Sequence, residues 1–173
     1  KINEGSSRPH FFVGVCTIIT KLFNIIKPTH AFFGEKDAQQ LLIIKQINND
    51  LNFNINIISG KTIREKSGLA MSSRNQYLSN KNKLLADVIY QSLIKALSFI
   101  QNGERSPLEL RKLIELKLKE KGMTIDYISI LDLVLLEEIN NEIDEKINNK
   151  ILISVAVYIE SIRLIDNVFY EFS

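Results

Sequence analysis

The sequence predicts an α/β protein in two parts: the later part of a parallel-sheet domain over residues 1–62, then a small α+β domain over residues 63–173. Two observations predict this division. Helix-like and strand-like patterns alternate up to Ser59-Gly60, which is the rhythm of a parallel sheet with crossover helices. Beyond that point two helical patterns come first and the strand patterns follow, as in a segregated α+β domain.

The first part is expected to contain a helix, a strand, a helix and a strand, over residues 13–26, 30–33, 38–49 and 53–58. Apolar residues at helical spacing predict the first helix, which Lys27-Pro28 ends. The first strand is a short apolar run closed by Gly34, so we expect it to be buried. Asp37 is the predicted N-cap of the second helix. Alternation of apolar and polar residues over 53–58 predicts a strand with one buried face.

The second part begins with a loop over 64–79 that is rich in Ser, Arg and Asn. Ser106-Pro107 predicts a helix start, with Ser as N-cap and Pro in the first turn. The expected elements are helices over 81–101 and 107–121, a strand over 127–135, a polar connection over 139–149, and a hairpin over 151–159 and 161–165. The apolar residues expected to face inward on the longer helix are Leu84, Leu85, Val88, Ile89, Leu93, Ile94 and Leu97.

The composition is that of an ordinary globular protein, with 45% hydrophobic and 24% charged residues. A formal net charge of +2 gives no reason to expect a nucleic-acid partner or a membrane surface. The single Cys16 excludes an internal disulfide, and His10 and His30 offer little material for a metal site. No apolar run is long enough to span a membrane and the start is polar, so we expect the cytoplasm.

Two segments could carry chemistry. Residues 33–40 join a strand to a helix, where ligands of open α/β sheets bind; Gly34 and Lys36 there suit a phosphate. Residues 64–75 combine hydroxyls, Gly68 and two arginines, which also suit phosphate oxygens. By pattern alone, residues 33–40 could instead be a solvated turn, and residues 64–75 could instead be a Ser-rich interdomain loop that caps the next helix.

Five segments together resemble the pantothenate synthetase (pantoate–β-alanine ligase) family: EGSSRP at 4–9, GVCTIITKLFNIIKP at 14–28, FGEKDAQQL at 33–41, REKSGLAMSSRNQYLS at 64–79 and RLIDN at 163–167. The resemblance implies a Rossmann-like domain of the nucleotidyltransferase superfamily. It also implies ATP-dependent ligation of pantoate and β-alanine through pantoyl adenylate, with release of AMP and pyrophosphate. Mg²⁺ and a homodimer are implied by the same resemblance.

The resemblance assigns roles to residues of the two segments. Those matched to ATP contacts are Gly34, Glu35, Lys36, Asp37, Ile63, Met71, Ser72, Ser73 and Arg74. Gln40 matches a glutamine that holds pantoate, and no residue here matches a metal ligand. Lys36, Ser72 and Arg74 are the candidate catalytic residues, because they are donors of the kind that stabilises negative charge on an α-phosphate. Residues 71–74 resemble the family's version of the mobile KMSKS loop.

The sequence departs from the family pattern at three places. His10-Phe11 stand where the family has Gly-His, Ser67 stands for an Asp, and Gly60-Lys61 stand for Val-Pro. The family's His-x-Gly-His motif and its magnesium-positioning carboxylates have no counterpart here. The chain is therefore interpreted as the carboxyl-terminal part of a synthetase, which we expect to be inactive alone.

Two other interpretations stay open. One is a truncated, non-catalytic remnant that binds nucleotide weakly or only dimerises. The other is an RNA-binding module, which rests only on the superfamily's kinship with tRNA synthetases. The net charge of +2 and the lack of a basic stripe with aromatic residues disfavour RNA binding.

Overall fold

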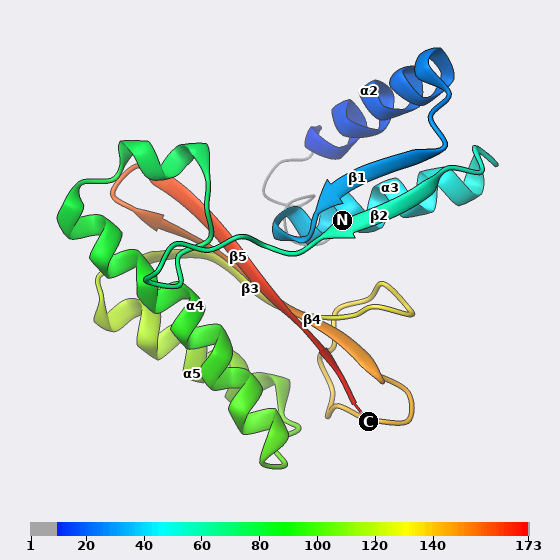
Figure 1. The fold of residues 1–173 in the computed structure, drawn as a ribbon. Helices are drawn as coiled ribbons and strands as arrows, with labels where there is room; N and C mark the ends of the chain where they lie inside the picture. The colour runs from blue at the N-terminus through cyan, green and yellow to red at the C-terminus, as the bar shows by residue number, and fades with distance from the viewer. Residues whose placement is uncertain (1–9, 173) are drawn as a thin grey trace. The chain divides into compact units, whose positions relative to one another are not determined.

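The computed structural model describes residues 10–172, and the chain divides into two compact units, Lys1–Thr62 and Ile63–Ser173 (Figure 1). The EGSSRP segment at 4–9 lies outside the described residues. The first unit contains helix α2 (Phe11–Ile26), strand β1 (His30–Gly34), the 3-10 helix η1 (Glu35–Asp37), helix α3 (Ala38–Asp50) and strand β2 (Asn56–Gly60). The two strands are parallel, as predicted, and Gly34 lies opposite Gly60 at their carboxyl ends.

One face of this two-stranded sheet packs against both helices. Phe23 of α2, Ile44 of α3 and Ile55 form a buried cluster, and Ala31 and Phe33 of β1 pack against it. The prediction that residues 30–33 form a buried strand is wrong, because exposure alternates along β1 and the Phe32 side chain is 73% exposed. Successive strand side chains point to opposite faces, and the described residues of this unit cover only one face.

Strand β2 begins three residues later than predicted, at Asn56 instead of Phe53. The preceding residues form a turn in which Asn52 and Asn54 adopt positive φ angles of 52° and 55°. Asparagine tolerates this left-handed conformation better than most residues. The Asn48 side chain fixes the turn by donating to the Ile55 carbonyl at 3.0 Å and accepting from its N–H at 3.1 Å.

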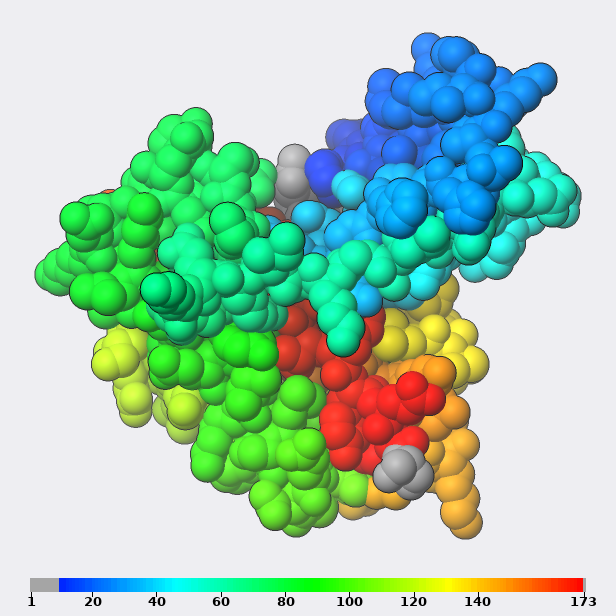
Figure 2. Space-filling view, in the orientation of Figure 1, coloured from blue at the N-terminus to red at the C-terminus, as the bar shows by residue number. Residues whose placement is uncertain are grey.

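The second unit has two layers. Its elements are the 3-10 helix η2 (Ser73–Tyr77), helices α4 (Asn80–Gln101) and α5 (Pro107–Glu120), and strands β3 (Thr124–Asp132), β4 (Lys150–Ile159) and β5 (Ile162–Glu171). The strands form an antiparallel sheet in the order β3-β4-β5, and α4 and α5 lie side by side against it (Figure 1). In the space-filling view, the red carboxyl-terminal strand reaches the surface between the green helices and the orange β4 (Figure 2).

Helix α5 begins at Pro107, as predicted, and α4 begins at Asn80, one residue before its predicted start. The hydroxyl of Ser79 accepts the N–H of Asn82 at 3.2 Å, and that of Ser106 accepts the N–H of Glu109 at 3.3 Å, so each serine caps its helix. Helix α4 is long and apolar enough to cross a membrane by length and composition alone, but its inward face is part of this unit's core.

The predicted inward face of α4 is partly wrong. Leu84 and Ile94 are 75% and 42% exposed. The fully buried positions include small side chains instead, at Ala86, Ser92 and Ala96. The helix therefore turns a face of small and branched residues to the core. A prediction based only on the spacing of large apolar residues cannot detect that face.

The strand predicted over 127–135 runs instead from Thr124 to Asp132, and the last strand extends to Glu171 instead of ending at Ile165. Asp132 ends β3 because its carboxylate accepts the N–H groups of Val134 and Leu135, at 2.6 and 2.8 Å. Burial acts to raise the pKa of Asp132, but these bonds and one from the Asn148 side chain together outweigh it. The pKa therefore lies below its ordinary value of 3.8.

Candidate functional site

The first predicted segment lies at the carboxyl edge of the parallel strands. Gly34 ends β1 beside Gly60 of β2, and the chain turns through η1 into α3. A side chain at Gly34 would meet none of the described residues within 4 Å, and its φ of −75° is open to any residue. Gly34 is therefore not required by the fold. Its surroundings in this unit leave the backbone accessible.

Lys36, Asp37 and Gln40 follow on η1 and the first turn of α3. Lys36 and Gln40 are half-buried and Asp37 is exposed. Asp37 occupies the N-cap position of α3, as predicted, but its side chain makes no capping hydrogen bond. The reason is its backbone conformation, φ −95° and ψ 58°, because an N-cap side chain reaches the helix from extended backbone. The candidates of this segment therefore all lie between the end of β1 and the first turn of α3.

The second predicted segment forms a tight loop in the second unit. Arg64 and Ala70 pair as an isolated antiparallel bridge. Inside it, the Glu65 N–H donates to the Leu69 carbonyl at 2.8 Å. Outside it, the Met71 N–H donates to the Ile63 carbonyl at 2.9 Å. The structure therefore places Ile63 beside Met71, although eight positions separate them in sequence.

The candidate residues stand at the exposed end of this loop. The side chains of Ile63 and Met71 are 71% and 55% exposed, Ser73 and Arg74 are exposed, and Ser72 is half-buried. The Ser72 hydroxyl accepts the Arg74 N–H at 3.2 Å, which caps η2. A hydroxyl can accept and donate together, so the O–H of Ser72 stays able to donate to a phosphate oxygen.

Asn75, just after the candidate residues, is almost completely buried. Its amide nitrogen donates to the Glu65 carboxylate at 2.9 Å and to the Ala70 carbonyl at 3.1 Å. Its amide oxygen is buried and has no hydrogen-bond partner among residues 10–172. Such an atom costs free energy, so the position is held by the two donated bonds and the surrounding packing. Asn75 closes the loop from its carboxyl-terminal side.

Comparison with known proteins identifies the family. The family model for pantoate-beta-alanine ligase matches residues 1–169. A pantothenate synthetase of Clostridium botulinum (strain 657 / Type Ba4) is 48% identical over 164 residues, which are 94% of this chain. This chain belongs to the pantoate-beta-alanine ligase family.

Solved structures of the family agree in fold. The crystal structure of pantothenate synthetase from Thermus thermophilus matches 96% of this chain with a TM-score of 0.86 at 33% identity. The pantoate-beta-alanine ligase from Francisella tularensis, solved in complex with beta-gamma ATP and beta-alanine, matches 96% with a TM-score of 0.66 at 34% identity. The chain spans 57% of the length of the C. botulinum relative, 59% of the T. thermophilus chain and 53% of the F. tularensis chain.

Sequence analysis missed the residues that hold the ligase-family loop in place. Arg64 and Asp166 form an ion pair between the loop and β5, and Asn75 ties the loop's two ends. The sequence marks Arg64 only as a phosphate candidate, and the structure shows its guanidinium committed to Asp166. The RLIDN segment at 163–167 could have indicated this ion pair, because it carries an acidic residue inside an apolar strand pattern.

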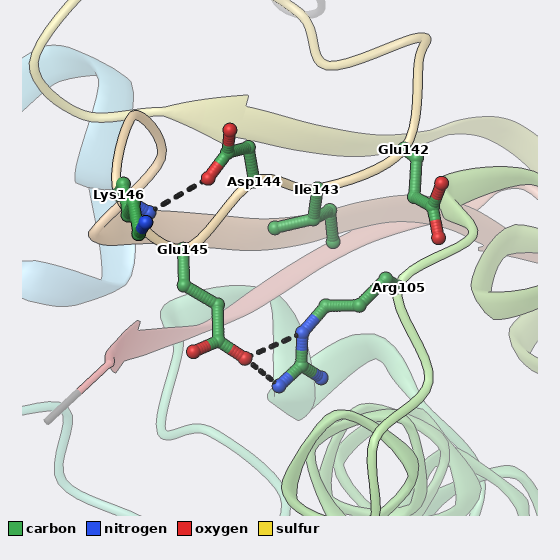
Figure 3. Close-up of a pocket in the computed structure, with 6 residues that line it drawn as sticks. All are labelled: Arg105, Glu142, Ile143, Asp144, Glu145 and Lys146. Atoms are coloured by element: carbon green, nitrogen blue, oxygen red, sulfur yellow. Dashed lines mark hydrogen bonds and ion pairs between the residues drawn. The ribbon is translucent and has the colours of Figure 1, made fainter.

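A separate hollow of about 560 Å³ lies in the second unit, lined by Arg105, Glu142, Ile143, Asp144, Glu145 and Lys146 (Figure 3). The Arg105 guanidinium is already used there, since it donates to the Glu145 carboxylate and to the carbonyls of Ile100 and Glu104. Residues 10–172 contain no group of three or more His, Cys, Asp or Glu that could hold a metal ion. Mg²⁺ is commonly held by one or two carboxylates together with substrate phosphates, so the expected Mg²⁺ stays an implication of the resemblance.

Proposed function

We propose that this chain carries the part of a pantoate-beta-alanine ligase that contains the Gly34–Gln40 and Ile63–Arg74 segments. The proposed reaction has two steps. A carboxylate oxygen of pantoate attacks the α-phosphate of ATP, the bond to pyrophosphate breaks, and pantoyl adenylate forms. The amine of β-alanine then attacks the acyl carbon, loses a proton, and expels AMP to give pantothenate.

One observation carries the proposal. The family match covers 1–169, and within it the residues resembling the second ATP segment stand exposed at the end of an anchored loop. Exposed hydroxyl, guanidinium and backbone N–H donors on a fixed base suit an anion whose charge grows in the transition state. We assign phosphate contacts to Lys36, Ser72, Ser73 and Arg74. Glu35 and Asp37 are carried over with Gly34 as part of the same ATP-contacting segment.

Two further contacts are proposed from the same resemblance. The Ile63 backbone meets the adenine, and one lone pair of its carbonyl remains for this, because Met71 uses only the other. Gln40 on the first turn of α3 holds pantoate through its amide. No step is assigned to Mg²⁺, which is carried over from the resemblance alone.

The proposal extends to the domain organisation, the oligomeric state and the location of the protein. We propose that residues 1–62 and 63–173 are separate domains, the first Rossmann-like, and that the protein is a cytoplasmic homodimer. The two compact units support the domain division. Sedimentation equilibrium tests the dimer. A monomer at every protein concentration would contradict it.

The deciding experiment measures AMP release from ATP, with pantoate and β-alanine each omitted in turn. It compares this chain with the same chain joined to the part of the C. botulinum relative that it does not match. We expect AMP release that requires both substrates in the joined protein, and none in this chain alone. A folded joined protein without that activity would refute the proposal and favour the non-catalytic remnant.

A further inference from the structure

The loop that carries the proposed ATP contacts is bound to the sheet of its own unit by one ion pair. The Arg64 guanidinium donates to both carboxylate oxygens of Asp166 on β5, at 2.6 and 2.9 Å. The Asp166 side chain is 3% exposed and that of Arg64 is 18% exposed. A bidentate pair with so little solvent contact fixes direction as well as distance.

Arg64 makes contacts on three other sides. Its guanidinium lies 3.6 Å from the centre of the Tyr90 ring, on helix α4. It also donates to the Gly68 carbonyl within the loop, at 3.1 Å, and approaches the Asn167 carbonyl at 3.4 Å. One side chain therefore joins the loop, a helix and a strand. Only a planar fork of donors can meet all of these partners together.

This anchor fixes the start of the loop, and Asn75 fixes its end. Between them, Leu69 and Ala70 are buried, at 4% and 3% exposure, which places the middle of the loop in the core. After this buried stretch, Met71, Ser73 and Arg74 are exposed and Ser72 is half-buried. They span four positions between fixed points, so their backbone has little freedom to move independently of the unit.

We propose that Arg64 and Asp166 are positioning residues, whose ion pair over Tyr90 holds residues 71–74 in the conformation that contacts the phosphates of ATP. The inference rests on the proposed function for the identity of the ligand. A ligand that binds only one conformation has its affinity reduced by the fraction of molecules in that conformation. Without the ion pair, residues 71–74 would spend part of the time elsewhere and bind nucleotide less well.

The test compares Asp166→Asn with Asp126→Asn in the whole chain. Asp126 is a matched control, because it forms an ion pair with Arg163 at 2.7 Å on the same sheet, with 21% of its side chain exposed. Amide hydrogen exchange is measured by NMR for Glu65, Gly68 and Met71, whose N–H groups bond within the loop. We expect Asp166→Asn to speed exchange at these amides about tenfold relative to Asp126→Asn.

The second measurement is a titration with ATP, followed through the amide signals of residues 72–74. We expect saturable shifts in the wild type and in Asp126→Asn, and about tenfold weaker binding in Asp166→Asn. Arg64→Lys keeps the positive charge but loses the fork, and should show the same weakening. Arg64→Lys also replaces Asp166→Asn as the test variant if Asp166→Asn does not fold.

Equal exchange and equal ATP affinity in Asp166→Asn, Arg64→Lys and Asp126→Asn would overturn the inference. A wild type without ATP-induced shifts would contradict the proposed nucleotide contact instead. In that case the exchange rates still decide whether the ion pair fixes the loop, since they need no ligand.

Discussion

Replacing Asn75 by aspartate tests how the loop is closed. The change keeps the shape of the side chain but removes the amide nitrogen that donates to Glu65 and Ala70. A hydrogen bond to a charged group contributes about 1.5–3 kcal/mol and a neutral one about 0.5–1.5 kcal/mol. Their loss alone predicts a fall in unfolding free energy of about 2–4 kcal/mol. The new carboxylate also faces the Glu65 carboxylate, which adds repulsion that Asn75→Ala lacks.

The chain offers a convenient probe for this measurement. All five tyrosines, at positions 77, 90, 127, 158 and 170, lie in the second unit and there is no tryptophan. Tyrosine fluorescence therefore follows the unfolding of that unit alone. With a urea dependence of about 2 kcal/mol per molar, the midpoint should fall by about 1–2 M for Asn75→Asp. Asn75→Ala should lose less.

A second substitution separates charge repulsion from lost packing. In Asn75→Asp/Glu65→Gln, the glutamine amide can donate to the new carboxylate, so the bond is rebuilt with its direction reversed. We expect the double variant to be more stable than Asn75→Asp, by an interaction energy of about 1–2 kcal/mol. An Asn75→Asp midpoint equal to that of the wild type, or no recovery on adding Glu65→Gln, would refute the reasoning.

Three further predictions concern single residues. In the joined ligase, Lys36→Ala should slow adenylate formation in a single turnover about 10²-fold, while Lys45→Ala on α3 should not; a normal rate would remove Lys36 from the phosphate contacts. Gly68→Ala should destabilise the second unit by about 1–3 kcal/mol, because φ is +100° and the new methyl group would lie 3.1 Å from Tyr90. Gly103→Ala has a φ of +97° but open space, so fluorescence-monitored unfolding should show a smaller loss there. The lowered pKa of Asp132 means that its charged form stabilises the fold above about pH 4, and this contribution is lost as the pH falls below 3.8. Urea midpoints should therefore fall more steeply below pH 4 in the wild type than in Asp132→Asn, and parallel curves would contradict this.

The elements that local chemistry determines could be predicted from sequence. Ser79 and Ser106 lie one residue before their helices, and a capping hydroxyl acts within three residues of its own position. The parallel pairing of β1 and β2 follows from the helix between them. Strand limits were less accurate. Asn52, Asn54 and Asp132 end or delay strands through turns that the apolar pattern does not reveal.

The anchoring of the candidate site could not be predicted in the same way. Arg64 and Asp166 are 102 positions apart, and the sequence around either residue does not indicate that the two form a pair. Asn75 lies in the segment REKSGLAMSSRNQYLS at 64–79, but its role depends on the loop returning to Glu65 and Ala70. Residue types suggested a phosphate contact at Arg64. Only the fold shows that this guanidinium is already engaged.

The two apolar clusters described above differ greatly in size, and this has a consequence for cooperativity. In the described part of the first unit, the buried cluster consists of Phe23, Ile44 and Ile55, whereas the second unit has a continuous core that spans both helices and all three strands. Elements with few buried contacts open at lower free energy than a large core does. Heating should therefore give two transitions, the first visible by far-ultraviolet circular dichroism but silent in tyrosine fluorescence. A single melting temperature would then describe neither unit.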